Sequence, residues 1–290
     1  MKTYKEYILE ADKKGIAIGH FNISNLEALH AIYNAAKKLN LPIIIGLSEG
    51  EEAFFGKDEA VAIVRTLRAK NNYPIFLNAD HHYSFETVKA SLDAGYDSAV
   101  IDLVRLPLEE NIRITKQCVE YARKLSKKEN REILIEAELG FIGSSSKILD
   151  KIPDGVSEAT MTTPEDAKHF VDATGVDLLA PSIGNVHGMV KSGNPRLHSE
   201  RVKAIRKATG IPLVLHGGSG SMDEDFIACI KEGIDIVHIN TEIRVAFTNA
   251  LRKSLADNPE EITPYKYLPK TVDAVQKVVE ARLKLFSGMK

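Results

Sequence analysis

Residues 16–47 read IAIGHFNISNLEALHAIYNAAKKLNLPIIIGL, and they contain the unit from which the fold is predicted. An apolar run at Ile16–Phe21 is followed by Asn25–Lys38, where apolar residues recur at helical spacing, and then by a second apolar run at Pro42–Leu47. Continuous apolar runs are typical of parallel strands that are covered on both faces. This stretch therefore predicts a strand, a helix and a second, parallel strand.

The same alternation continues along the chain until eight apolar runs are reached. The other six predicted strands are Ile75–Asn78, Ser98–Asp102, Ile133–Ala137, Leu178–Pro181, Leu213–Leu215 and Ile236–Ile239. A doubly wound open sheet is the main alternative, but no G-x-G-x-x-G motif follows the first strand, and eight units are many for an open sheet of this length. We therefore predict an α/β fold, a (β/α)8 TIM barrel. An N-terminal helix at about Thr3–Lys14 and an extra C-terminal helix complete a single domain over residues 1–290.

The composition is that of an ordinary globular protein. Of its 290 residues, 44% are hydrophobic and 27% are charged, which excludes disordered, collagen-like and coiled-coil proteins. The 38 basic and 40 acidic residues nearly balance, so we expect no nucleic-acid partner and no membrane partner. Cys118 and Cys229 both fall in predicted helices, which argues against disulfides and thiolate metal clusters. With no signal-like or membrane-spanning apolar segment either, a cytoplasmic location is expected.

Histidines gather where the predicted strands end. Six of the nine do so: His20, His81, His82, His187, His216 and His238. In a barrel of this kind the active site lies at the carboxyl ends of the strands. Three imidazoles with a fourth position open are what a catalytic Zn²⁺ requires, and His81, His187 and His216 fit that requirement best. For any one of them the alternative is a hydrogen-bonded structural histidine.

Carboxylates stand beside these histidines. Asp80 precedes His81 and is expected to be a second ligand, an orienting partner of a ligand or a proton carrier. Asp102 and Glu138 are candidates for holding a second or alternative divalent ion. Since no lysine falls at the end of a predicted strand, imine catalysis is disfavoured.

A glycine-rich turn follows the seventh predicted strand. His216-Gly-Gly-Ser-Gly220 leads into a predicted helix near Asp223, so free backbone N–H groups are available to bind phosphate. Asn240-Thr241 supplies a second set of donors after the eighth strand. The alternative for both is a plain turn and a helix N-cap. The longest non-helical stretch, about Leu139–Thr162, is predicted to be a functional or mobile loop.

At these positions the chain resembles the class II, metal-dependent fructose-bisphosphate aldolases and their tagatose-bisphosphate relatives. The resemblance extends over nearly the whole sequence. It rests on Gly19-His-Phe-Asn-Ile-Ser-Asn-Leu-Glu, Asn78-Ala-Asp-His-His, Glu136-Ala-Glu-Leu-Gly, Ser182-Ile-Gly-Asn-Val-His-Gly, Leu213-Val-Leu-His-Gly-Gly-Ser-Gly and Ile239-Asn-Thr-Glu-Ile-Arg.

The resemblance implies a role for each matching residue. His81, His187 and His216 would bind a catalytic Zn²⁺, with Asp102 and Glu138 at an alternate metal position, and Asp80 would exchange a proton with the substrate's C4 hydroxyl. The residues implied to hold the dihydroxyacetone-phosphate half are Gly188, Gly217, Gly218, Ser219, Asn240 and Thr241. The main chain near Gly188 and Gly217 would bind a monovalent cation, Na⁺ or K⁺. Ser48 matches a substrate-contacting serine.

Three departures from the family pattern bear on the substrate. His238 stands where the family usually has an asparagine that contacts substrate. The loop after the fifth strand reads Phe141-Ile-Gly-Ser-Ser-Ser-Lys instead of a Gly-Gly-Glu-Asp-like sequence, which leaves Asp150, Asp154 or Glu158 as replacements for its glutamate. An Asp-Pro-Arg stretch whose arginine binds the distal phosphate is absent, and Arg244 or Lys266 is expected to compensate.

The resemblance implies a zinc-dependent lyase that cleaves fructose 1,6-bisphosphate reversibly to dihydroxyacetone phosphate and glyceraldehyde 3-phosphate. Tagatose 1,6-bisphosphate or another phosphorylated ketose is the first alternative. A zinc hydrolase and a non-catalytic barrel that binds metal and phosphate are further alternatives. Three imidazoles also accept Co²⁺ or Mn²⁺. The family is dimeric or larger, so a homodimer or homotetramer is expected.

Overall fold

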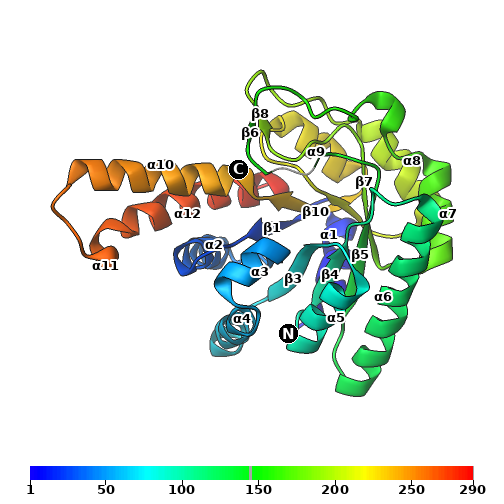
Figure 1. Cartoon of the computed structure of the whole chain (residues 1–290), viewed down its shortest axis with the longest axis horizontal. Helices are drawn as coiled ribbons and strands as arrows, with labels where there is room; N and C mark the ends of the chain where they lie inside the picture. Colours follow the sequence, from blue (N-terminus) through cyan, green and yellow to red (C-terminus); the bar gives the residue numbers. More distant parts are fainter. Residues whose placement is uncertain (144–145, 290) are drawn as a thin grey trace.

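The computed structural model describes residues 1–143 and 146–289, with the strands at the centre and the helices around them (Figure 1). Eight parallel strands close into a barrel in the order β1-β10-β9-β7-β5-β4-β3-β2. Their bounds are β1 Ile18–Asn22, β2 Ile43–Ser48, β3 Ile75–His82, β4 Ser98–Ile101, β5 Leu134–Leu139, β7 Leu178–Pro181, β9 Leu213–Leu215 and β10 Ile234–Ile239. The predicted (β/α)8 TIM barrel is confirmed.

Twelve α-helices accompany the barrel within the described residues, and most of them cover its outside. They are α1 Tyr4–Lys14, α2 Leu26–Leu39, α3 Glu49–Phe55, α4 Lys57–Asn71, α5 Phe85–Ala94, α6 Leu108–Glu129, α7 Pro164–Thr174, α8 Ser199–Thr209, α9 Asp223–Lys231, α10 Thr241–Asp257, α11 Pro264–Tyr267 and α12 Pro269–Phe286. The N-terminal helix is α1 and the extra C-terminal helix is α12, as predicted. In Figure 1, α10 and α12 run side by side away from the barrel and meet at α11. Cys118 and Cys229 are free and buried, within α6 and α9.

At their carboxyl ends, β3 and β5 extend at least two residues further than the sequence predicts. β3 continues to His82 and β5 to Leu139, because Asp80 pairs with Ser48 of β2 and Glu138 pairs with Ala180 of β7. The predicted loop at Leu139–Thr162 also holds some regular structure. Its β6 strand, Ile148–Leu149, pairs with β8, Met189–Val190, and a 3₁₀ helix spans Glu158–Thr160.

The barrel interior changes from apolar to polar along the strands. At the N-terminal end it is filled by an apolar cluster that α1 closes, and Tyr4 of α1 stacks on Phe76 with ring centroids 4.6 Å apart. Side chains two residues apart on a strand face the same side. Two residues beyond the buried apolar residues Ile18, Phe76, Leu134, Val214 and Ile236 come the buried polar residues His20, Asn78, Glu136, His216 and His238. The strands therefore deliver polar side chains to the C-terminal half of the interior.

Within the part of the chain that the structure describes, no helix combines the length and the apolar character needed to span a membrane.

Candidate active site

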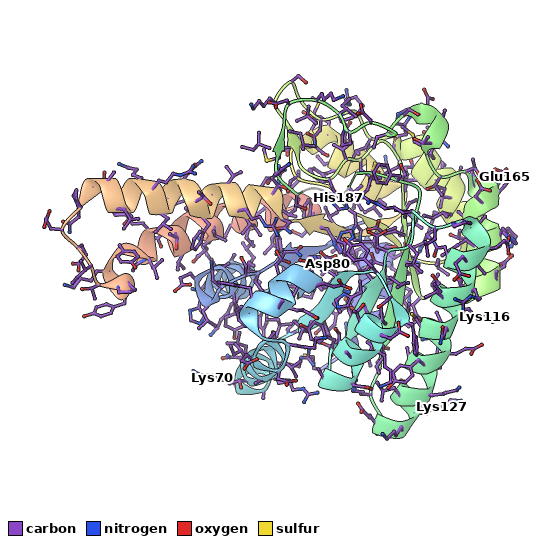
Figure 2. All side chains as sticks on the ribbon, viewed as in Figure 1. Lys70, Asp80, Lys116, Lys127, Glu165 and His187 are labelled. Carbon is purple, nitrogen blue, oxygen red and sulfur yellow. The ribbon has the colours of Figure 1, made fainter. Side chains whose placement is uncertain are left out.

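The carboxyl ends of the strands surround a cavity at the centre of the barrel mouth, near the labels of Asp80 and His187 in Figure 2. It is lined by Asn22, Asp80, His81, Ser146, His187, Gly188, His216, Gly217, Gly218, Ser219, His238, Asn240 and Thr241. An adjoining outer cavity also contacts Ser48, Asp102 and Arg244. Glu138 lines neither cavity, but its side chain is buried beside His81 and His216 and so belongs to the same site.

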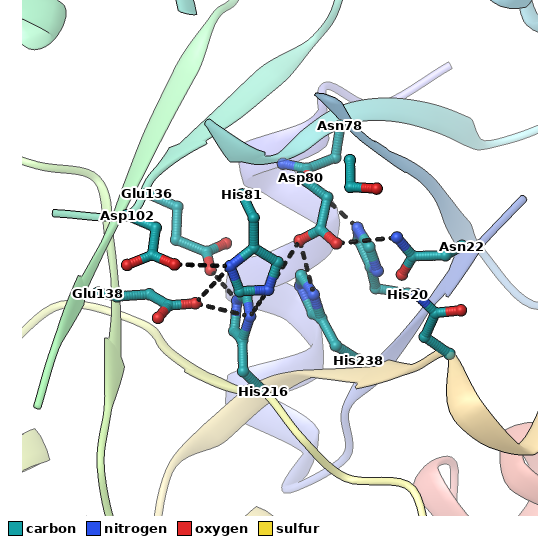
Figure 3. A network of polar contacts seen from close by, with 12 residues as sticks. His20, Asn22, Asn78, Asp80, His81, Asp102, Glu136, Glu138, His216 and His238 are labelled. Atoms are coloured by element: carbon teal, nitrogen blue, oxygen red, sulfur yellow. Dashed lines mark hydrogen bonds and ion pairs between the residues drawn. The ribbon is translucent and has the colours of Figure 1, made fainter. Parts of the chain in front are cut away.

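Four residues form a group that suits a metal ion. His81, Glu138, His187 and His216 each offer one ligand atom, and these atoms all lie within 4.8 Å of one another. Oε1 of Glu138 is 3.1 Å from Nδ1 of His81 and 3.0 Å from Nδ1 of His216, yet it has no hydrogen-bond partner among the described residues (Figure 3). A buried carboxylate oxygen without a hydrogen-bond partner, facing several imidazole nitrogens, is the donor set expected of a divalent metal site.

His81 has an unusual backbone. Among the described residues, four that are not glycine have positive φ; three of these are asparagines at helix ends, and the fourth is His81 at +47°. A histidine in this conformation costs about 1–3 kcal/mol and persists only where the surroundings impose it. The distorted backbone directs the ring so that Nδ1 faces Asp102 and Glu138, at 3.1 Å each.

His216 is oriented by a residue to which the sequence analysis gave no role. Nε2 of His216 lies 2.6 Å from Oε1 of Glu136, which leaves Nδ1 facing Glu138 and His81. Carboxylates of this kind fix the ring and the tautomer of a metal-binding histidine. Glu136 lies two residues before Glu138 on β5, so strand alternation was the signal that both face inward.

Asn22 and His238 flank the carboxylate of Asp80. Nδ2 of Asn22 donates to its Oδ2 at 2.8 Å, and Nδ1 of His238 lies 3.4 Å from its Oδ1 (Figure 3). Burial raises the pKa of Asp80, but the positive charge on His81 and the contact with His238 outweigh it, so the pKa lies well below its usual range. Asp80 is therefore a carboxylate at neutral pH.

His238 rests on a stacked histidine. The rings of His20 and His238 are parallel within 2°, and their centroids are 3.4 Å apart. Nε2 of His20 faces Oδ1 of Asn78 at 3.2 Å. A Cβ on Gly46 would lie 2.1 Å from the His20 ring, so only glycine fits there. His20, Asp80 and His238 also form a close group of possible ligands, but in-plane lone pairs of parallel rings do not converge on one ion.

The predicted phosphate-binding residues form one pocket from three segments. Asn194, which the sequence analysis missed, joins two of them: its Nδ2 donates to the carbonyl oxygens of Gly188 at 3.2 Å and Ser219 at 2.9 Å. Gly217 has φ +62°, and a Cβ there would lie 2.4 Å from the oxygen of Val186. The third segment is the N-terminus of α10, whose free N–H groups attract anions.

Other predicted residues lie further out. Ser48 donates to Oε2 of Glu51 at 3.0 Å, and Arg244 pairs with Oε1 of the same glutamate at 2.6 Å. Asp150 and Asp154 form ion pairs with Lys191 and Lys151 on the surface. His82 faces outward from β3, where its Nε2 contacts Glu52 and Ser91. Ser144 and Ser145 of the predicted loop motif lie outside the described residues.

Comparisons with known proteins identify the family. Residues 2–289 match the family model described as Fructose-bisphosphate aldolase class-II. A fructose-bisphosphate aldolase of Geobacillus stearothermophilus is 40% identical over 289 residues, covering 99% of this chain and 96% of that protein.

Solved structures give the same result. The YdjI aldolase of Escherichia coli K12 is 30% identical, with a TM-score of 0.81, covering 97% of this chain and 96% of that one. A protein of Coccidioides immitis, described as a putative fructose-1,6-biphosphate aldolase, is 30% identical, with a TM-score of 0.78 and coverage of 98% and 95%. Members of the matched family are metal-dependent lyases that act on phosphorylated sugars. The chain belongs to the class II fructose-bisphosphate aldolase family.

Proposed function

We propose that this protein is a zinc-dependent lyase that cleaves fructose 1,6-bisphosphate reversibly to dihydroxyacetone phosphate and glyceraldehyde 3-phosphate. The observation that carries this proposal is the group His81, Glu138, His187 and His216, with the carboxylate of Asp80 beside it and a glycine-rich pocket next to it. Together they offer a metal site, a proton carrier and an anion site within one cavity.

His81, His187 and His216 would hold the zinc and leave its fourth position open, and the carboxylate of Glu138 lies beside them. Asp102 contacts the same nitrogen of His81 as Glu138 does, which fits the alternate metal position implied for these two carboxylates. When bound, the ion supplies Lewis acidity that stabilises the negative charge developing on the ketone-derived half of the substrate. Zinc is proposed because imidazole suits it, although Co²⁺ and Mn²⁺ share this donor chemistry.

Asp80 would carry the proton. In the cleavage direction its carboxylate accepts the proton of the C4 hydroxyl as the C3–C4 bond breaks, the C4 oxygen becomes the aldehyde oxygen, and the bonding pair remains on C3. In the condensation direction Asp80 returns this proton. Asn22 and His238 hold the carboxylate in one orientation, which is what general acid–base catalysis needs.

The phosphate of the dihydroxyacetone half would bind in the three-segment pocket. The residues proposed to contact it are Gly188, Gly217, Gly218, Ser219, Asn240 and Thr241. Main-chain carbonyls near Gly188 and Gly217 are proposed to hold a monovalent cation, Na⁺ or K⁺, that offsets its charge. Ser48 and Arg244 line the outer cavity and are proposed to contact the aldehyde half.

One observation is a reason to test a second substrate. His238 is buried against Asp80 and changes the shape of the cavity wall near the reacting carbons. Tagatose 1,6-bisphosphate differs from fructose 1,6-bisphosphate at one hydroxyl, so it is the alternative to test first. We expect fructose 1,6-bisphosphate to be the better substrate.

The proposed enzyme is a single cytoplasmic domain that assembles as a homodimer or homotetramer. The arm of α10, α11 and α12 supports assembly, since it projects from the barrel (Figure 1) and leaves Ile262 87% and Tyr265 77% exposed. A cytoplasmic location suits substrates whose phosphate charges prevent them from crossing membranes. Light scattering of the purified protein would give the mass of the assembly.

The decisive experiment is a coupled assay of dihydroxyacetone phosphate release from each bisphosphate. It is run on the native protein, after chelation, and after Zn²⁺ is restored. Turnover that chelation abolishes and zinc restores is the expected result. A folded, zinc-loaded protein that releases no dihydroxyacetone phosphate from either sugar would refute the proposal.

A further inference from the structure

A side cavity lies next to the outer part of the proposed active site. It has a volume of about 410 Å³, within the range of small-molecule sites, and it is formed by the segments that follow β3, β4 and β5. Leu103, Leu106 and Phe141 give it apolar walls, and Arg105 also lines it.

This side cavity adjoins the outer cavity. Tyr83, Asp102 and Gly143 line both, and the outer cavity also contains Asp80 and His81. The side cavity therefore lies next to the cavity in which a substrate would meet Asp80 and His81.

Arg105 differs from the other candidate cations. Its guanidinium carbon lies 5.9 Å from the centroid of the Phe141 ring, and no carboxylate of the described residues lies within ion-pair distance of it. Arg244, in contrast, pairs at 2.6 Å with Glu51, which is only 6% exposed. Lys266 pairs with Glu261 at 3.2 Å and belongs to α11, at the far end of the arm (Figure 1).

From this contrast we infer that Arg105 and the side cavity form the subsite for the phosphate at the far end of the aldehyde half. The inference rests on the proposed function and names a site for the second phosphate. A guanidinium binds phosphate through paired charge-assisted hydrogen bonds. Apolar walls strengthen such an ion pair because they lower the local dielectric constant.

Among the described residues that line the side cavity, Asp102 is the only carboxylate, and it is already engaged. Oδ2 of Asp102 lies 3.1 Å from Nδ1 of His81, and its Oδ1 accepts from the N–H of Val104 at 3.4 Å. The negative charge of Asp102 is thus partly compensated within the protein, and Arg105 is the charge that remains available to an anion.

The test compares two sugars that differ only in the far phosphate, fructose 1,6-bisphosphate and fructose 1-phosphate. For wild type and Arg105→Gln we measure kcat/KM with each sugar and, by calorimetry, the Kd of each. For the bisphosphate, we expect Arg105→Gln to lower kcat/KM and to raise Kd, each about 10- to 100-fold, as for a lost charge-assisted contact. For the monophosphate, both quantities should change less than twofold.

Two further variants complete the design. Arg113→Gln removes one positive charge from the exposed surface of α6, where Arg113 pairs with Glu110, and should change neither sugar. Arg244→Gln should affect both sugars equally or neither. A selective loss of the bisphosphate in Arg244→Gln, or no selective loss in Arg105→Gln, overturns the inference.

The two proposals fail in different ways. If the zinc-loaded wild type cleaves neither sugar, yet Arg105→Gln selectively weakens bisphosphate binding, the proposed reaction is refuted and the subsite is supported. If both sugars are cleaved and Arg105→Gln alters them equally, the subsite is refuted and the reaction stands. If wild type binds the bisphosphate no better than the monophosphate, the subsite is also refuted.

Discussion

The two ends of the barrel treat buried charge in opposite ways. At the N-terminal end, three aspartates lie near the starts of β4, β7 and β10. Each accepts a hydrogen bond from a backbone N–H of the preceding barrel strand. Each also pairs with an arginine of the helix that leads into that preceding strand. The sets are Asp97 with Leu77 and Arg68, Asp177 with Ile135 and Arg123, and Asp235 with Leu213 and Arg206. Each carboxylate there has both a charge partner and a backbone donor.

At the C-terminal end, polar atoms remain unsatisfied. Within the described part of the chain, Oδ1 of Asp80, Oε1 of Glu138, Nδ1 of His20 and Nε2 of His238 are buried without a hydrogen-bond partner. Leaving such an atom unpaired costs about 1–3 kcal/mol. The N-terminal end therefore stabilises the barrel, while the C-terminal end keeps hydrogen-bonding and ligand atoms free for a metal ion and a substrate.

The largest effect is expected from His216→Ala. This change removes one proposed metal ligand and the partner of Glu136, so both metal content and turnover should be lost. Metal content is measured by elemental analysis and turnover by the coupled assay. Full zinc occupancy in this variant would show that the ligand set is wrong.

Asp80→Ala should separate metal binding from proton transfer. Its zinc content should stay near that of wild type, while kcat falls by roughly 10²-fold or more, as for other lost acid–base groups. The same two measurements check this. Normal turnover in Asp80→Ala would exclude Asp80 as the proton carrier.

A smaller effect is expected at His238, which is proposed to position Asp80. His238→Leu removes the ring nitrogen that faces Asp80, and kcat should fall about 10-fold with unchanged metal content. His238→Asn keeps a donor and should recover most of that loss. Equal kcat values in the Leu variant and in wild type would argue against positioning.

At the opposite end, Asp177→Ala should lower stability and spare catalysis. It breaks a two-point ion pair and a backbone hydrogen bond, so the free energy of unfolding should fall by about 2 kcal/mol. Urea unfolding measures this change, and kcat/KM should remain within twofold of wild type. A loss of activity without a loss of stability would contradict the division between the two ends.

The third aspartate should make stability depend on pH. Burial raises the pKa of Asp235 to about 7; Arg206 opposes the rise and Asp12 adds to it. The folded state then binds a proton that the unfolded state has released above about pH 4, so stability falls as pH rises from about 4 to 7. Urea unfolding at several pH values should show that the free energy of unfolding falls by about 2–3 kcal/mol between about pH 5 and pH 8.

Asp12→Asn provides the control for this pH effect. Without the Asp12 carboxylate, Arg206 pairs with Asp235 only, and the pKa of Asp235 is expected to fall. The loss of stability with rising pH should therefore be smaller in Asp12→Asn. An unchanged pH profile would mean that another group causes the effect.

The amino-acid order alone indicates which residues reach the C-terminal end of the barrel. The period of the apolar runs fixes where each strand lies, and strand alternation fixes which side chains face inward. Asp80, His216 and His238 can therefore be assigned to the interior near one end from the order of residues alone. The apolar composition of each strand was enough to predict the barrel, because parallel strands that are covered on both faces are apolar throughout.

Which of these side chains contact one another depends on the tertiary structure. Glu138 faces His216 from another strand. Gly46, which has no side chain, leaves the space that the His20 ring occupies. Arg244 forms an ion pair with Glu51. These contacts join residues that are distant in sequence, and they depend on strand register and barrel closure. The side cavity at Arg105 depends on how three loops fold against one another. Local periodicity carries no information about such contacts, because they arise only when separate segments pack in three dimensions.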